Sequence, residues 1–176
     1  MSARSVIATA AVAAAWLTGA LGLSEGAAAA PAGRVVQVAG TGVDLHNTLI
    51  VHSETKTPSG VLQRSTEIVE LNGDLHGKVL YQVTTVIDSA KGTLVNTGSQ
   101  VYSGTVAGSE PVMLYDHRFR FEVNLATGAE HGVVYLVGHL AGPRVQCRLR
   151  VTGTGKDAPG NPTFSYRGEC TFAAGD

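Results

Sequence analysis

The chain has 176 residues and a formal net charge of −1, from 13 basic and 14 acidic side chains. This length predicts a single folded domain. The near-neutral charge argues against a nucleic-acid partner or a membrane-surface role that depends on bulk charge. The 22 glycines, together with many threonines and valines, are typical of short strands joined by tight turns.

Residues 1–30 have the pattern of a secretory signal peptide. Arg4 is the only charge in a short leading region, residues 6–23 are apolar, and residues 27–30 are all alanine, which supplies a small-residue cleavage pattern. An uncleaved anchor is the alternative, because an apolar run of this length nearly spans a bilayer. We predict cleavage, and therefore a secreted protein without a stable membrane anchor, in which a flexible lead-in over residues 31–42 precedes a folded domain over residues 43–176.

Alternation of apolar and polar residues predicts a series of strands after the lead-in. The first strands in chain order cover residues 43–53, 64–71, 78–87, 93–106, 112–125 and 132–140. Turn signals separate them, and the clearest is Asn72-Gly73, a pair that is typical of hairpin turns.

The last two strands, within residues 145–172, show the strictest alternation, and both cysteines lie on their apolar face. One register keeps every apolar residue on one side. It pairs Cys147 with Cys170, Leu149 with Gly168, Val151 with Tyr166 and Gly153 with Phe164. A disulfide between Cys147 and Cys170 is expected in an exported chain with only these two cysteines. Two separate buried thiols are the alternative.

Eight strands at hairpin spacing predict an all-β domain with antiparallel neighbours. Such a set either closes as an up-and-down barrel or splits into a β-sandwich. We favour the eight-stranded barrel, because closure removes the exposed edges of long strands that carry few edge charges. The interior of a barrel of this size holds side chains or one small ligand.

Glycines punctuate the strand ends in a repeated rhythm. It is seen in LNGDLHG at residues 71–77, in YSGTVAG at residues 102–108, and between Phe121 and Gly128. This rhythm resembles that of the allene oxide cyclase barrel-like proteins, which are eight-stranded, calycin-like barrels. The resemblance covers residues 43–172. It implies a barrel mouth that can hold an apolar small molecule, and with it cyclase activity, but it places no catalytic residue.

Tyrosines and histidines supply the candidate ligand-binding side chains. The apolar faces of the third, fifth and sixth strands would carry five of them into the barrel, namely Tyr81, Tyr115, His117, Tyr135 and His139. Ligand pockets combine apolar walls with a few polar groups, and an enclosed imidazole can act as a general acid or base near neutral pH. The alternative is that these groups are core or rim side chains with structural hydrogen bonds.

Other charged residues give narrower expectations. Glu67 and Glu70 lie on opposite faces of the second strand, so only one can point inward, where its pKa would rise. Five arginines are expected on outward faces and would form a basic stripe only if their strands are neighbours: Arg118, Arg120, Arg148, Arg150 and Arg167.

The histidine spacing does not predict a metal site. His46 and His52 are six residues apart, which is roughly 20 Å along a strand, so one ion cannot bind both without ligands from other strands. We expect no metal and no cofactor.

Three functions remain open. The first is a secreted barrel that binds a small apolar molecule in its interior or mouth. The second is a cofactor-free cyclase or isomerase on the same barrel, and the third is an extracellular interaction module with a filled core. A cavity of a few hundred cubic ångströms, on the order of known ligand pockets, would favour the first two.

Overall fold

The computed structural model describes residues 33–174, which form ten β-strands and no helix. The strands are β1 (Arg34–Thr57), β2 (Gly60–Gly73), β3 (Leu75–Asp88), β4 (Thr93–Val106), β5 (Val112–Asp116), β6 (Arg120–Asn124), β7 (Glu130–Leu136), β8 (Gly138–Ala141), β9 (Val145–Lys156) and β10 (Pro162–Phe172). The predicted signal peptide, residues 1–30, lies outside the described residues.

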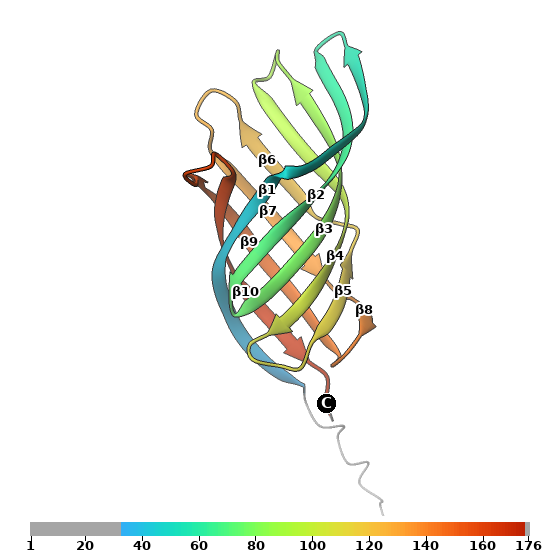
Figure 1. Ribbon diagram of the computed structural model, residues 1–176, viewed down its shortest axis with the longest axis vertical. Coiled ribbons are helices and arrows are strands. Elements are labelled where there is room, and N and C mark those ends of the chain that lie inside the picture. The colour runs from blue at the N-terminus through green and yellow to red at the C-terminus, as the bar shows by residue number, and fades with distance from the viewer. Residues whose placement is uncertain (1–32, 175–176) are drawn as a thin grey trace, which may run out of the picture.

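The strands close into one antiparallel barrel (Figure 1). Around the ring the order is β3-β2-β1-β10-β9-β7-β6-β4, and the ring closes because β3 also pairs with β4. In the ring, the short strand β5 continues the place of β6, because β4 pairs with both of them. The short strand β8 continues the place of β7, because it pairs with β5. The prediction of an all-β, eight-stranded antiparallel barrel is confirmed, and the sandwich alternative is wrong.

The closing hairpin has the predicted register. Cys147 lies opposite Cys170 and Leu149 lies opposite Gly168. The two cysteines form a disulfide with their Cα atoms 4.1 Å apart, and both are buried. The disulfide prediction is therefore confirmed, and the strict alternation on β9 and β10 reflects one face packed in the core.

Strand β1 begins at Arg34, so the predicted flexible lead-in is wrong for residues 34–42. These residues pair with β10, from Arg34 opposite Phe172 to Gly42 opposite Phe164. The glycines that suggested a loop instead make room for aromatic rings. A Cβ atom at Gly40 would overlap the Tyr166 ring, and one at Gly42 would overlap the Phe164 ring.

The predicted strand over residues 112–125 is broken between β5 and β6, and the break changes which side chains point inward. The buried carboxylate of Asp116, 0% exposed, accepts hydrogen bonds from the backbone N–H of Arg118 at 2.6 Å and of Tyr135 at 2.7 Å. A short polar side chain that binds the backbone two residues ahead forms a local turn. The predicted inward face is therefore correct for Phe119 and Phe121 and wrong for the residues before the turn.

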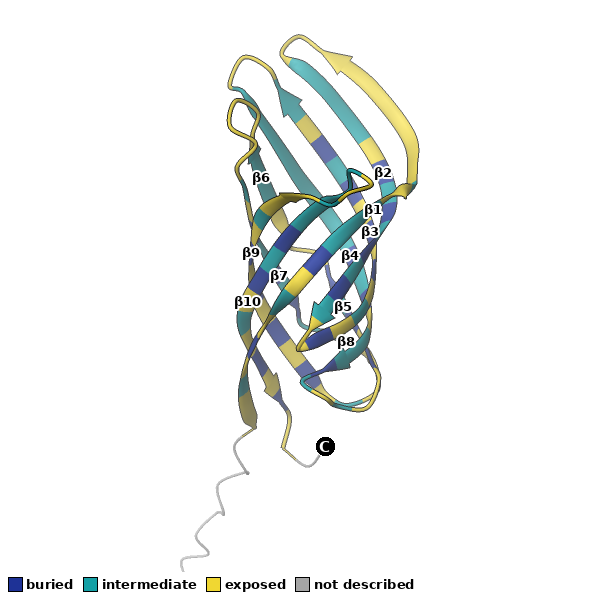
Figure 2. Cartoon of the chain, turned by 60° about the vertical axis from the view of Figure 1, so that its left-hand side comes forward, coloured by how far each residue is buried: buried dark blue, intermediate teal, exposed yellow. Residues whose placement is uncertain are grey.

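The two ends of the barrel differ. At one end, which we call the flared end, the β1–β2 and β3–β4 hairpins extend past the rest of the barrel, and the outer part of β1 is exposed (Figures 1 and 2). Residues 50–57 of β1 pair with β2 and with no second strand, because pairing with β10 ends at Val43.

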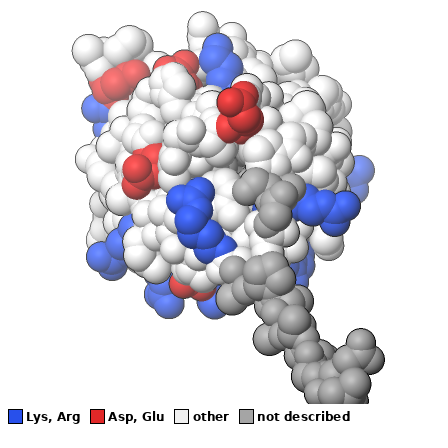
Figure 3. All heavy atoms as spheres, turned by 90° about the horizontal axis from the view of Figure 1, so that it is seen from below, with Lys and Arg blue, Asp and Glu red and all other residues white. Residues whose placement is uncertain are grey.

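The opposite end, which we call the closed end, is packed with buried side chains, among them Leu75, Tyr102, Val106, Val112 and Val145. Seen from this end, acidic and basic side chains are dispersed among uncharged ones (Figure 3). The hydroxyl of Tyr166 accepts a hydrogen bond from the backbone N–H of Leu75 at 2.7 Å and lies 3.2 Å from the carbonyl oxygen of Asn72. Strand β10 thereby holds the β2–β3 turn across this end.

Candidate functional site

A cavity of about 50 Å³ lies inside the barrel. Its apolar lining consists of Val69, Leu71, Val79, Phe121, Val134, Leu136, Leu149, Val151 and Phe164. Its polar lining consists of Asp44, Tyr81, Asn96, Gln100, Glu130 and Tyr166. Most of the wall is therefore hydrocarbon.

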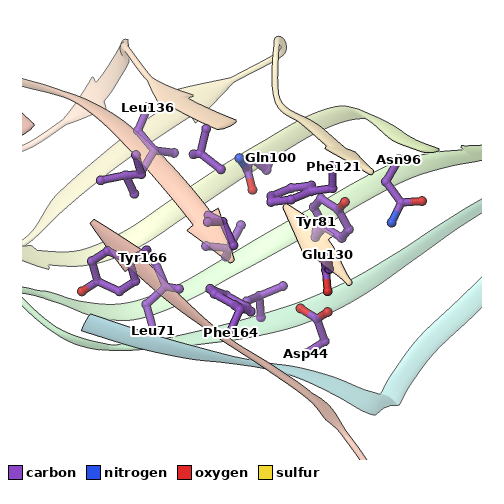
Figure 4. A pocket seen from close by; sticks show the side chains of 15 residues that line it. Asp44, Leu71, Tyr81, Asn96, Gln100, Phe121, Glu130, Leu136, Phe164 and Tyr166 are labelled. Carbon is purple, nitrogen blue, oxygen red and sulfur yellow. The ribbon is translucent and has the colours of Figure 1, made fainter. Parts of the chain in front are cut away.

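The polar groups gather at one end of the cavity (Figure 4). Asp44, Tyr81, Asn96 and Glu130 lie together, whereas Leu136, Leu71 and Tyr166 lie at the other end. Asp44 follows Val43, the last residue of β1 that pairs with β10. The polar end of the cavity therefore faces the flared end of the barrel.

The volume limits what the interior can hold. It is well below the roughly 300–1,000 Å³ of pockets that bury drug-sized molecules. It exceeds the roughly 10–15 Å³ that a single water requires. The interior thus accommodates a few waters or a short hydrocarbon group, and a larger ligand would extend through the flared end.

Three carboxyl groups approach the polar end from different strands: Asp44 on β1, Glu67 on β2 and Glu130 on β7. Burial raises the pKa of Asp44 to about 8, and the neighbouring charges of Glu67 and Glu130 contribute to the rise. Burial also raises the pKa of Glu130, with a further contribution from Glu67. A carboxyl that loses its hydration and faces other carboxyls is harder to ionise, so these groups retain protons that exposed acids would release.

Glu67 shows the same effect on β2. Its side chain is 9% exposed and shares its face with Ser65, Val69 and Leu71, which also point inward. Burial raises the pKa of Glu67, and His46 partly opposes the rise. The expectation that an inward-pointing glutamate on this strand has a raised pKa is confirmed for Glu67. Glu70 lies on the opposite face of the strand.

Tyr81 points into the barrel, as predicted. Its ring lies 4.8 Å from that of Phe119 and 6.1 Å from that of Phe121, measured between centroids. Burial raises the pKa of its hydroxyl well above the ordinary value, and nearby Asp44 adds to this effect. The phenol therefore stays protonated and can donate a hydrogen bond.

Two buried oxygen atoms at this end have no hydrogen-bond partner among the described residues: Oε2 of Glu67 and Oδ1 of Asn96. A buried acceptor without a donor costs about 1–3 kcal/mol. Asn96 lines the cavity, and Glu67 lies beside it, near enough to Asp44 and Glu130 to raise their pKa. The described residues therefore leave two acceptors unused at or beside the polar end of the cavity.

The other four predicted ligand-binding residues lie outside the cavity, so their assignment to the barrel interior is wrong. Tyr115 and His117 stack on each other with ring centroids 5.7 Å apart, and His117 is exposed. Tyr115 precedes the turn that Asp116 forms with Arg118, and His117 lies within it, where the strand changes phase.

Tyr135 and His139 also lie outside the cavity. Tyr135 is on the outer face, between Arg118 at 4.9 Å and Arg148 at 5.6 Å from its ring centroid. His139 is exposed, and its Nε2 lies 2.8 Å from the carbonyl oxygen of Gly142. The inward residues of β7 are instead Val134 and Leu136.

Sequence reasoning missed Asp44, Asn96 and Glu130. Asp44 lies in phase with Val38 and Gly42, which are buried, but the glycines hide this pattern. Glu130 begins β7, where a turn was predicted. Counting every second residue onward from Val38 reaches Asp44 through Gly40 and Gly42, and neither glycine gives an apolar signal.

Four of the five arginines lie on strands, Arg120 on β6, Arg148 and Arg150 on β9 and Arg167 on β10, and Arg118 lies between β5 and β6. In the barrel β9 and β10 are adjacent, and β7 separates β9 from β6. Arg150 lies directly opposite Arg167. An outer groove of about 530 Å³ is lined by Arg148, Arg150 and Arg167, but also by Asp74 and Glu169. The condition for a basic stripe is met on β9 and β10, although acidic residues partly balance it.

No group of three or more histidine, cysteine, aspartate or glutamate side chains within residues 33–174 could hold a metal ion. The same residues include no helix that is long and apolar enough to cross a membrane.

No protein-family model, no curated protein and no solved structure matches this chain. The barrel and its cavity are therefore the evidence that bears on function.

Proposed function

We propose that the barrel binds a small molecule at its flared end. An apolar part of the molecule would enter the cavity, and a polar part would lie beside Asp44, Glu67 and Glu130. The observation that carries this proposal is the distribution of polar groups in the cavity. Its inner part is lined by apolar side chains, and its polar side chains gather toward the flared end. Sites with largely apolar walls and a few grouped polar side chains are typical of small-molecule binding.

The buried acids favour a ligand over a purely structural core. Apolar residues of similar volume usually stabilise a core as well as or better than buried charged groups do. Here the pKa of Asp44 is raised to about 8, and one oxygen of Glu67 has no partner among residues 33–174. A filled-core interaction module gains nothing from this arrangement, whereas a binding site can use it.

Export and family membership are part of the proposal. The disulfide between Cys147 and Cys170 is consistent with an oxidising compartment outside the cytoplasm. The closed barrel is the fold that the resemblance to allene oxide cyclase barrel-like proteins implies. These observations support a secreted member of that family.

A second candidate function is cofactor-free acid–base catalysis by a cyclase or isomerase. The observation that favours it is the pKa of Asp44, which at about 8 keeps this carboxyl protonated at neutral pH. A protonated acid on an apolar wall can donate a proton to a bound substrate. The cavity walls would hold the substrate in a reactive conformation.

A fragment screen followed by nuclear magnetic resonance tests the binding proposal. We expect small apolar compounds to shift the backbone signals of β2, β3 and β7. Val134→Phe, which fills the cavity, should abolish these shifts. Val133→Phe is the matched control, because Val133 is the neighbouring residue on the outer face. If Val134→Phe does not fold, Val134→Leu replaces it and should weaken binding. Absence of any ligand, or unchanged binding to the filled variant, would contradict the proposal.

A further inference from the structure

We propose that the ligand of this cavity is a small amphipathic amine. Its ammonium group would lie among Asp44, Glu67 and Glu130, and its short apolar body would occupy the cavity. This inference rests on the proposed function and names the ligand class of the same site.

The hydrogen-bonding capacity of the site favours a ligand that donates. Oε2 of Glu67 and Oδ1 of Asn96 are buried acceptors with no partner in the described structure, and Glu67 is 9% exposed. An alkylammonium group offers three N–H donors and no acceptor. A hydroxyl offers one donor, and a carboxylate offers none. The ammonium group is therefore the best complement to these oxygens.

The charge of the site points to the same class. The residues that line the cavity include two acids and neither lysine nor arginine. The titratable groups that face the three carboxyls are His46 from β1, Tyr81 from β3 and His131 from β7. Both histidines are exposed. No buried base pairs with these acids among the described residues. An ammonium group that displaced a proton from one of them would therefore be the positive partner that the described site lacks.

Aromatic rings border the same end of the cavity. Tyr81, Phe119 and Phe121 form one cluster, with centroids 4.8 to 6.1 Å apart. The faces of such rings attract cations within about 6 Å. The cavity of about 50 Å³ limits the buried apolar body to a few carbon atoms, so any longer substituent would point out of the flared end.

Three probes with the same alkyl chain test this inference: n-butylamine, 1-butanol and butyrate. They are titrated into the disulfide-linked protein at pH 7.5 and followed by nuclear magnetic resonance. We expect n-butylamine to bind at least about tenfold more tightly than 1-butanol, because charge-assisted hydrogen bonds exceed neutral ones by this factor or more. We expect no binding of butyrate.

Release of protons from the carboxyls on amine binding is a second measurable effect. Acids with a purely structural role would not release protons when the amine binds. The ammonium group should lower the pKa of the carboxyls it contacts and displace their protons. The heat of n-butylamine binding should therefore depend on the ionisation enthalpy of the buffer, and the affinity should rise from pH 6 to pH 8. The heat of 1-butanol binding should not depend on the buffer.

The variant Glu67→Gln tests the contribution of the ammonium group separately from that of the apolar cavity. It should weaken n-butylamine binding about tenfold or more and leave 1-butanol binding unchanged. Glu70→Gln is the matched control, because Glu70 is on the outer face of the same strand. If Glu67→Gln does not fold, Asp44→Asn serves in its place.

The outcomes distinguish the two proposals. Equal affinities for n-butylamine and 1-butanol, a preference for butyrate, or an equal effect of Glu70→Gln would overturn the amine inference and leave small-molecule binding intact. Failure of n-butylamine while apolar fragments bind would do the same. Failure of every probe and every fragment would overturn the proposed function itself.

Discussion

Glu67 on β2 lies directly opposite Tyr81 on β3, and both side chains are buried inside the barrel. The pKa of Tyr81 is raised first by burial and then by nearby acids, of which Glu67 is one. The phenol therefore remains a hydrogen-bond donor throughout the physiological pH range, next to a carboxyl that accepts. Their opposite positions bring a donor and a side chain with an unused acceptor onto neighbouring strands near the polar end of the cavity.

Stability should fall as the pH rises through the range in which Asp44 titrates. Its pKa is about 8 in the folded state, against an ordinary value of 3.8. Between these values the folded protein holds a proton that the unfolded chain releases, so unfolding becomes easier as pH increases. Glu67 and Glu130 act in the same direction, because burial raises their pKa too.

Asp44→Asn tests this effect. At about 1.4 kcal/mol per pKa unit, we expect the variant to be more stable than the wild type by on the order of 2 kcal/mol or more at pH 8. The difference should vanish near pH 3.5. Urea unfolding at several pH values measures it. His46 and His131 face these acids and are present in both proteins. A wild-type stability that rises from pH 5 to pH 8 would contradict the prediction.

Loss of the disulfide should destabilise the barrel without changing its topology. Cys147 and Cys170 are 23 residues apart in sequence, and a closed loop of this size contributes about 3 kcal/mol. The double variant Cys147→Ala, Cys170→Ala should lose about this much free energy of unfolding in urea. Intact-mass measurement of the wild type should show the loss of two hydrogens, about 2 Da, relative to the reduced protein. A wild type that keeps both hydrogens would show that the bond is not formed.

Tyr166→Phe should weaken the closed end. The missing hydroxyl leaves the backbone N–H of Leu75 without its 2.7 Å acceptor, which costs about 1–3 kcal/mol for a buried donor. Tyr135→Phe is the control, because its ring lies on the outer face, and a change of about 0.5 kcal/mol or less is expected there. Thermal and urea unfolding of both variants provide the comparison. Equal effects of the two changes would contradict the role given to the Tyr166 hydroxyl.

Asp116→Ala should be among the most destabilising single changes in the barrel. Its carboxylate accepts two backbone N–H groups and, at 3.1 Å, the side-chain amide of Gln100. Removal leaves several donors unpaired at a position that is 0% exposed, and a loss of about 3 kcal/mol or more is expected. Asp157→Ala, in the β9–β10 turn, supplies a comparison, because the Asp157 carboxylate also accepts two hydrogen bonds, both from Asn161, but is only part-buried. A loss below that of the control would show that Asp116 does not maintain the break between β5 and β6.

The parts of the fold that sequence could predict are those where alternation is unbroken. Cys147 and Cys170 lie on strands whose every second residue is apolar, and their pairing followed directly. Tyr115 and His117 were misplaced because Asp116, a polar residue in the middle of an apolar pattern, points inward and binds the backbone. Such a turn depends on N–H groups from Arg118 and Tyr135, and the second of these comes from another strand.

The candidate site was predicted only in part for a related reason. Tyr81 could be placed inside because its neighbours Val79 and Val83 mark an apolar face. Asp44 could not, because the inward positions before it include Gly40 and Gly42, which carry no side chain and so give no apolar signal. Those positions are occupied by the rings of Tyr166 and Phe164 from β10, a relationship that only the paired strands disclose.

The pairing of β1 with β10 gives the barrel a cyclic order. Arg34 lies opposite Phe172, with its guanidinium carbon 4.4 Å from the centroid of that ring. A circular permutant that joins these two positions by a short linker, and that begins in the turn after Asp88, would meet the same neighbours in the same sequence around the ring. The order of strands around the ring thus does not depend on which turn carries the chain ends. Folding must nevertheless await the synthesis of β10, because only this strand completes the circle.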